Sequence, residues 1–149
     1  MLERHCRVNY ECDCPWKRAM PYEDYRAEWF RLQGQISEFS GMLLESMKDN
    51  RTIAEIIESE DGEKVAYLWV QFIITENGFK YAEVQDIYIE EKFRNSGIGT
   101  ALMVYAEAKA RENGARVIRS GTGCENTKSI GMHGKLGYYQ YRYDYEKLL

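Results

Sequence analysis

The stretch Val84–Gly99, VQDIYIEEKFRNSGIG, decides how this chain folds. Its first half carries the β-branched and aromatic residues that are typical of a strand. Two glycines, Gly97 and Gly99, then lead into residues 100–113, TALMVYAEAKAREN, which are rich in helix formers and stop at Gly114. The sequence therefore predicts a strand that runs through a glycine loop into the first turn of a helix.

A loop of this kind is suited to a phosphate group. The first N–H groups of a helix have no partner within the helix and lie at its positive end. Gly97 and Gly99 have no side chains, so a ligand can approach the backbone there. A dinucleotide fingerprint would need a third glycine at Leu102, and a P-loop would need glycine at Thr122 and Thr127. We therefore expect a phosphate or pyrophosphate site of another kind.

Two motifs in this chain resemble the GNAT family of N-acetyltransferases. The first is R-x-x-G-x-G at Arg94, Gly97 and Gly99, after D-I-Y-I, and it is similar to the acetyl-CoA signature of that family. The second, NTKSIGMHGKLGY at residues 126–138, resembles the family's N-x-x-A/S-x-x-x-Y/H-x-K-L-G-F/Y segment. The two motifs occur in the family's order, and the resemblance is good over residues 82–149.

The pattern along the chain predicts an α/β (α+β) fold with a mixed, mostly antiparallel central sheet flanked by helices. Apolar residues on both parities of 64–75 indicate a central strand that is covered on both faces. Asn77-Gly78 predicts the hairpin that follows it. The order β-αα-βββ-α-β-α-β coincides with the GNAT fold, and residues 1–149 are expected to form a single N-acetyltransferase domain. The expected elements are a strand at 4–12, helices at 21–33 and 36–48, strands at 52–58, 64–75 and 80–89, a helix at 97–113, a strand at 115–122, a helix at 126–136 and a strand at 138–147.

Composition sets the broad class of protein. The chain has 149 residues, of which 44% are hydrophobic and 30% are charged, with a net charge of −4. This is typical of one soluble domain with a proper core. The absence of a basic block argues against nucleic acid as a partner. No apolar run approaches the roughly 18 residues needed to span a bilayer, and MLERHCRVNYECDC lacks the apolar core of a signal peptide. We expect a cytoplasmic protein without a membrane partner.

The four cysteines, Cys6, Cys12, Cys14 and Cys124, are expected to be free thiols in a reducing compartment. The spacing of the first three suggests a metal site as the alternative. A structural zinc site usually has a second pair of cysteines, which is missing here, so His5 and Cys124 would have to complete it. The sequence therefore favours unpaired thiols and no metal.

The family resemblance implies acetyl-CoA as the cosubstrate. In the family, the pyrophosphate lies on the backbone amides of the loop, and the pantetheine arm lies along the preceding strand like an added strand. A strand amide would also hold the developing oxyanion. On the same resemblance Asn126 would bind the cofactor, or else only cap its helix, and Ser129 would face the pantetheine. The matching positions are Ile87, Tyr88 and Ile89 in the strand, and Arg94, Asn95, Ser96, Gly97, Ile98, Gly99 and Thr100 in the loop.

Acetyl transfer also needs an acid for the leaving thiolate and a base for the amine. His133 occupies the position where the family commonly has a tyrosine acid, and phosphinothricin-type acetyltransferases carry the same N-x-x-S-x-x-x-H. Glu83, in Y-A-E-V, resembles the general-base glutamate of the histone acetyltransferases. Asp86 is the competitor, on the other face of the expected strand, and a reaction without a protein base stays open. No cysteine matches a family catalytic position, so we expect direct attack in a ternary complex.

The acceptor pocket is the part least defined by the sequence. Tyr22, Tyr25 and Trp29 recur at helical spacing and could cage a cationic amine. Tyrosines at every second position from Tyr139 to Tyr145 indicate sheet packing or the subunit interface of a homodimer. We expect transfer to a primary amine of a small molecule or peptide. The alternatives are a non-catalytic acyl-CoA-binding or sensing domain and an interaction module that uses the tyrosine-rich end.

Overall fold

A computed structural model describes residues 2–13, 19–48, 51–145 and 147, with the backbone alone for residues 12–13 and 33–39. Its strands form one four-stranded sheet in the order β1-β2-β3-β4. The first three strands are antiparallel neighbours, and β4 runs parallel to β3. The predicted mixed, mostly antiparallel sheet is therefore confirmed. The strands are β1 (Thr52–Glu58), β2 (Lys64–Ile74), β3 (Lys80–Ile89) and β4 (Val117–Ser120).

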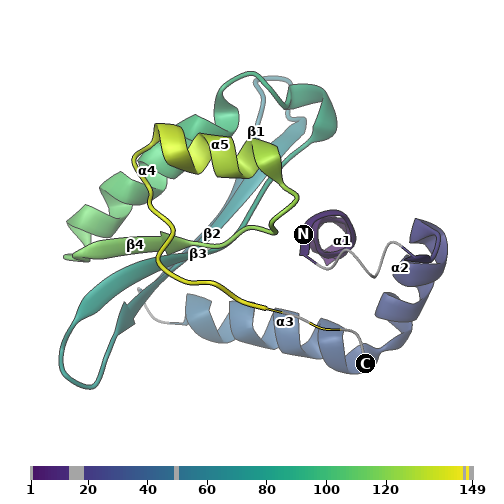
Figure 1. The fold of residues 1–149 in the computed structure, drawn as a ribbon, viewed down its shortest axis with the longest axis horizontal. Helices are drawn as coiled ribbons and strands as arrows, with labels where there is room; N and C mark the ends of the chain where they lie inside the picture. The colour runs from purple at the N-terminus through teal and green to yellow at the C-terminus, as the bar shows by residue number, and fades with distance from the viewer. Residues whose placement is uncertain (1, 14–18, 49–50, 146, 148–149) are drawn as a thin grey trace.

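Helices cover both sides of this sheet. In Figure 1, α4 and α5 lie above the sheet, α3 lies below it, and α1 and α2 lie to the right. Four of these helices agree with the predicted ones to within three residues at each end. They are α2 (Tyr22–Arg31), α3 (Gln33–Met47), α4 (Ile98–Glu112) and α5 (Thr127–Lys135). The remaining α-helix of the described residues is α1 (Leu2–Val8).

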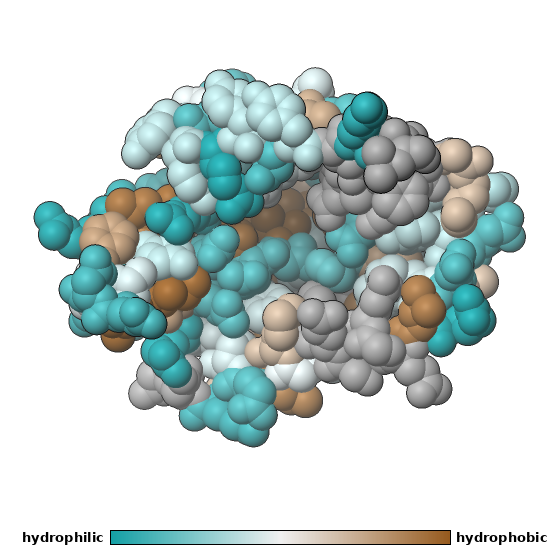
Figure 2. Space-filling model, turned by 60° about the horizontal axis from the view of Figure 1, so that its bottom comes forward, coloured by the Kyte–Doolittle hydropathy of each residue, from teal (hydrophilic) through white to brown (hydrophobic). Residues whose placement is uncertain are grey.

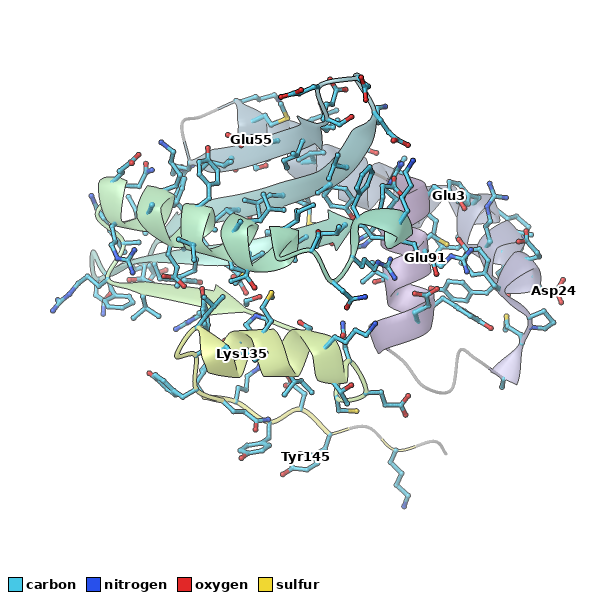
Figure 3. All side chains as sticks on the ribbon, turned by 90° about the horizontal axis from the view of Figure 1, so that it is seen from above. Glu3, Asp24, Glu55, Glu91, Lys135 and Tyr145 are labelled. Atoms are coloured by element: carbon cyan, nitrogen blue, oxygen red, sulfur yellow. The ribbon has the colours of Figure 1, made fainter. Side chains whose placement is uncertain are left out.

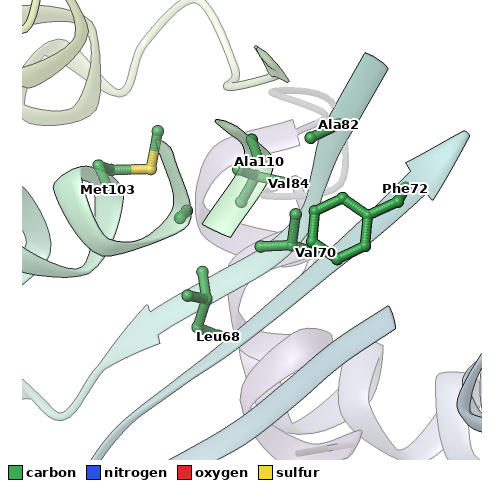
Figure 4. Close-up of a cluster of buried hydrophobic side chains, with 8 residues drawn as sticks. Leu68, Val70, Phe72, Ala82, Val84, Met103 and Ala110 are labelled. Carbon is green, nitrogen blue, oxygen red and sulfur yellow. The ribbon is translucent and has the colours of Figure 1, made fainter. Parts of the chain in front are cut away.

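The main core lies between the sheet and α4. Leu68 and Val70 of β2 and Met103 of α4 are 0% exposed. Their side chains fill the layer between the two elements, together with alanines that let helix and sheet approach closely (Figure 4). This packing fixes the start of α4 against the sheet, and with it the loop that precedes the helix. The whole cluster is Leu68, Val70, Phe72, Ala82, Val84, Met103, Ala106 and Ala110.

The strand predicted at residues 4–12 is wrong. This segment forms α1 and a π-helical turn, Asn9–Asp13. Leu2, Cys6 and Tyr10 recur every four residues, which is a helical period, and all three belong to the cluster that packs on α2. The alternation that suggested a strand here is poor. The four-residue period is the better guide, because these apolar residues face a neighbouring helix rather than a sheet.

The strand predicted at residues 138–147 is also wrong. Residues 138–145 have no regular secondary structure. Tyr139 is 82% exposed and Tyr145 is 92% exposed, and Tyr145 lies on the outside of the molecule (Figure 3). Alternating aromatic residues fit a pleated surface, but alternation alone does not supply a partner strand. Residues 146 and 148–149 lie outside the described residues.

Two cysteines are defined by the structure as free thiols, Cys6 and Cys124. Cys6 is buried, and its burial raises the pKa of the thiol, whereas Cys124 is exposed. Cys14 lies outside the described residues, as does the side chain of Cys12. Within the part of the chain that the structure describes, no helix is both long enough and apolar enough to cross a membrane.

Candidate functional site

A β-bulge in β3 shapes the candidate site. Trp69 of β2 pairs with Asp86, and the next residue, Val70, pairs with Val84. Gln85 is therefore an extra residue in β3. The described residues of β4 pair with β3 only as far as Val84. Beyond the bulge, no strand of the described residues pairs with the edge of β3 that faces away from β2, and at its end the Ile89 carbonyl accepts from Arg94 Nε.

The main-chain groups of Ile87 and Ile89 point toward this open edge. The N–H of Glu90 donates to a β2 carbonyl at 2.8 Å. Residues of an antiparallel pair alternate between those that are bonded to the neighbouring strand and those that are not. Tyr88 therefore directs its main-chain groups toward β2, and Ile87 and Ile89 direct theirs away from it. Of the three predicted strand contacts, these two have the suitable orientation.

The loop before α4 presents a row of amides. Gly97 has φ of 86° and Asn95 has φ of 63°, so both lie in the left-handed region. The first helical hydrogen bond runs from the N–H of Ala101 to the carbonyl of Gly97 at 3.0 Å. Among the described residues, no protein acceptor meets the amides of residues 95–100. Consecutive amides in such a turn, at the positive end of a helix, make a concavity that suits an anion.

The loop is tied to both neighbouring elements. Arg94 donates from Nε to the carbonyl of Ile89 at 2.9 Å, and its guanidinium lies 5.2 Å from the centre of the Tyr88 ring. A Cβ on Gly99 would lie 3.4 Å from Ile89 Cδ1 and 3.4 Å from Met132 Sδ. Position 99 thus lies between β3 and α5 with room for little more than a methyl group, whereas Gly97 supplies the backbone conformation of the turn.

His133 lies on α5 with a defined tautomer. Its Nδ1 is 2.7 Å from the carbonyl oxygen of Ser129. A carbonyl can only accept, so Nδ1 donates and the neutral ring keeps its lone pair on Nε2. That Nε2 is buried and has no hydrogen-bond partner among the described residues. A buried polar atom without a partner is costly, and here it is an atom that can exchange a proton.

Asn126 and Ser129 hold the start of α5. The side-chain oxygen of Asn126 accepts the N–H of Ser129 at 3.1 Å, which is the predicted N-cap. Ser129 Oγ lies 3.3 Å from His133 Nδ1. The cap explains the presence of Asn126 at this position, and the two residues set the position of the His133 ring.

The bulge also places Glu83 and Asp86 on the same face of the sheet. They lie opposite Gln71 and Trp69 respectively, and residues two apart in a strand share a face. The expectation that Asp86 lies on the other face from Glu83 is therefore wrong. In a regular strand a separation of three residues changes the face, and Gln85 cancels that change.

The two carboxylates have different surroundings. Asp86 is 8% exposed and accepts the Tyr67 hydroxyl at 2.6 Å, and its Oδ2 lies 2.7 Å from His5 Nδ1. Burial, followed by the charge of Asp86, raises the pKa of Tyr67, so the phenol stays protonated and donates. Glu83 is half-buried, and no hydrogen bond or ion pair joins its carboxylate to the part of the chain that the structure describes. Glu83 is therefore the carboxylate that an amine can reach.

The three predicted acceptor residues lie in the contact between α1 and α2. Tyr25 is 8% exposed and Trp29 is 6% exposed. The guanidinium of Arg7 lies 3.8 Å from the centre of the Tyr22 ring, and the Tyr22 hydroxyl donates to Glu3 at 3.1 Å. A cation of the protein itself thus covers Tyr22. Trp29 is linked to β3 through His5, whose ring centre lies 6.3 Å from that of Trp29 and whose Nδ1 lies 2.7 Å from Asp86.

Two hollows mark the surface. Figure 2 shows one face hollowed near its middle, with apolar side chains at the bottom and hydrophilic ones on the rim. A separate depression of about 670 Å³ lies beside the end of β3. Four of its charged side chains form two ion pairs, Arg4 with Glu90 and Lys92 with Glu63. It is lined by Arg4, Glu63, Lys64, Glu90, Glu91 and Lys92.

An open strand edge that leads into free amides at a helix N-terminus suits a ligand with a phosphate group and an extended arm. The sequence profile of the acetyltransferase (GNAT) family matches residues 11–138. The chain belongs to this family, as its two motifs predict.

Known proteins similar to this chain agree with that assignment. An uncharacterised N-acetyltransferase of Methanocaldococcus jannaschii is 37% identical over 57 residues, which are 38% of this chain and only 25% of that protein. A putative acetyl transferase from Pyrococcus furiosus has a TM-score of 0.69 and 21% identity, over 99% of this chain and 93% of that one. An aminoglycoside N-acetyltransferase in complex with CoA has a TM-score of 0.60 and 19% identity, over 87% and 96%. The last two share the fold.

Proposed function

We propose that this protein is an N-acetyltransferase that uses acetyl-CoA to acetylate a primary amine by direct attack in a ternary complex. The observation that carries the proposal is the open edge of β3, which continues into the unpaired amides of residues 95–100. The pyrophosphate would lie on these amides and the pantetheine beside Ile87 and Ile89. Membership of the GNAT family and the CoA complex of a protein with the same fold support this arrangement.

The residues of this chain would divide the proton transfers between them. Bound acetyl-CoA supplies an acyl thioester, in which the C–S bond breaks as the amine forms a C–N bond. Glu83 would accept the proton that the amine loses, directly or through a water molecule. A protonated His133 would donate its Nε2 proton to the leaving thiolate, because its Nδ1 proton is held by Ser129. An amide on the open edge of β3 would stabilise the negative charge on the carbonyl oxygen.

Replacement of Glu83 by glutamine should lower the rate mainly at low pH. A lysine-type amine has a pKa of about 10.4, so roughly one molecule in a thousand is neutral near pH 7.4. Without a carboxylate to take the proton, the reaction depends on this small fraction, which grows tenfold with each pH unit. The measurement is kcat/KM for thiol release between pH 6 and 10. A loss that is equal at every pH would show that Glu83 is not the base.

Calorimetry with acetyl-CoA tests the cofactor site. Acetyl-CoA should bind the wild-type protein, and Gly97→Ala should weaken binding about 10-fold or more, since alanine disfavours the left-handed turn that aligns the amides. Gly62→Ala is the matched control, because Gly62 has φ of 77° and an equally open surrounding in the turn between β1 and β2. It should have the same backbone cost and leave CoA affinity unchanged.

Calorimetry, together with a thiol-release assay over a panel of amines, distinguishes three outcomes. No binding of acetyl-CoA to the wild-type protein would refute the proposed function. Equal weakening by both glycine variants would show that backbone strain, rather than the Gly97 loop, controls affinity. Tight binding without thiol release over a panel of amines would instead identify a non-catalytic acyl-CoA-binding domain.

A further inference from the structure

Arg119 of β4 lies on the face of the sheet that carries Glu83. The two residues are partners in the parallel pairing of β3 with β4, and paired residues direct their side chains to the same face. The preceding residue, Ile118, packs against the core on the opposite face. The next pair, which contains Val84, is the last before β3 and β4 separate. The two side chains thus leave the same face of the sheet at neighbouring positions, close to where the open edge begins.

The Arg119 side chain is held by two aromatic rings. Its guanidinium carbon lies 4.2 Å from the centre of the Tyr81 ring and 5.2 Å from the centre of the Tyr141 ring. Stacking of this kind leaves the edge of the planar guanidinium, with its N–H groups, available for a ligand. The orientation of Arg119 is therefore fixed without the use of its hydrogen-bond donors.

No carboxylate of the described residues forms an ion pair with Arg119, although Glu83 is its neighbour. Six other arginines of the described residues do form an ion pair with a carboxylate, as Arg111 does with Glu107 of the same helix at 3.1 Å. Arg119 and Glu83 thus offer one free positive and one free negative charge at neighbouring positions. The arginines with a carboxylate partner are Arg4, Arg7, Arg26, Arg31, Arg111 and Arg142.

We propose that Arg119 binds a carboxylate of the acceptor while Glu83 binds its amine, so that the acceptor is a free α-amino acid. This inference rests on the proposed function. Paired residues of neighbouring strands lie about 5 Å apart, and an α-amino acid carries its ammonium and carboxylate groups on one carbon. A guanidinium can hold a carboxylate with two parallel hydrogen bonds. The same arginine would repel a polycationic acceptor, whose additional charges would lie beside it.

Matched pairs of acceptors that differ by one carboxylate test this proposal. Phenylalanine is compared with phenethylamine, and lysine with cadaverine, by thiol release at saturating acetyl-CoA. The wild-type protein should prefer the carboxylated member about 10- to 100-fold in kcat/KM, the usual value of a charged hydrogen bond. Arg119→Gln should abolish this preference, and Arg119→Lys should retain part of it, because it keeps the charge and loses the planar fork. Arg116→Gln removes an exposed arginine three residues away and should leave the preference unchanged.

The two proposals fail in different ways. Thiol release with equal kcat/KM for both members of each pair would overturn the inference about the acceptor and leave the proposed function standing. An absence of thiol release with every amine would refute the proposed function. In that case ligand-observed NMR on the CoA-saturated protein decides the inference. Binding of phenylalanine, but not phenethylamine, that is lost in Arg119→Gln supports it, and equal binding of the two overturns it.

Discussion

Replacing His133 with alanine should lower kcat by about 10²- to 10⁴-fold, which is the usual contribution of a positioned general acid. The expectation rests on the surroundings of one atom, Nε2 of His133. Nδ1 is held by the Ser129 carbonyl at 2.7 Å, and Nε2 is buried without a partner among the described residues. The measurement is steady-state thiol release at saturating acetyl-CoA.

The controls separate catalysis from packing. His133 contacts Tyr138 edge to face, with the ring centres 5.1 Å apart, so its removal also leaves a space. His133→Phe fills that space without a proton to donate and should lose as much activity as the alanine variant. His133→Tyr restores a donor of the type that is common in the family and should recover part of the rate. If the alanine variant bound acetyl-CoA normally and kept its kcat, His133 would not be the acid.

The sequence predicts the middle of this fold well because the local signals there agree with the tertiary structure. The Asn77-Gly78 turn fixes the hairpin between β2 and β3, and both parities of β2 are apolar because both faces are covered. The start of α4 follows from the glycine loop that precedes it. Each of these features is determined by residues close together in the chain.

The ends of the fold depend on partners that are distant in the sequence. The helical period of Leu2, Cys6 and Tyr10 is visible, but the segment is short and its cluster is completed by Tyr25 and Trp29 of α2. At the other end, the alternating tyrosines indicate a strand that no described residue pairs with. The secondary-structure propensity of a segment shows which structures it can form, but packing against a neighbouring element decides which one it forms.

In the candidate site, too, local sequence patterns locate some residues and not others. Gly97 and His133 are found by motif, because the spacing within each motif is local. The shared face of Glu83 and Asp86 depends on Gln85, a single bulged residue that no alternation rule reveals. The contact of His5 with Asp86 and the pairing of Arg119 with Glu83 do not follow from local patterns, since these partners come from other elements. The signal that would have suggested Arg119 is its parity with Tyr81 and Glu83, once the pairing of β4 is known.

Replacing Asp86 with alanine should lower the free energy of unfolding by about 3 kcal/mol, as loss of the acceptor in a buried, charged hydrogen-bond network usually does. The carboxylate is 8% exposed and accepts the Tyr67 hydroxyl at 2.6 Å, and His5 Nδ1 lies 2.7 Å from it. Alanine would leave the buried Tyr67 hydroxyl without its acceptor. It would also remove the contact that His5 of α1 makes with β3, while Arg4 of the same helix keeps its contact with the Tyr88 ring. The measurement is urea unfolding followed by tryptophan fluorescence.

A double-mutant cycle with Tyr67→Phe identifies the cause of this loss. Tyr67→Phe alone should cost about 1 kcal/mol, and the double variant should be more stable than the sum of the two losses implies, because neither polar group is then left unpaired. The pKa of Tyr67 is raised on folding. Its contribution to stability is therefore complete below the unfolded pKa of about 10 and is lost as the pH rises above it. Tyr67→Phe should reduce that alkaline loss, and strictly additive effects in the cycle would show that the hydroxyl and the carboxylate do not act as a pair.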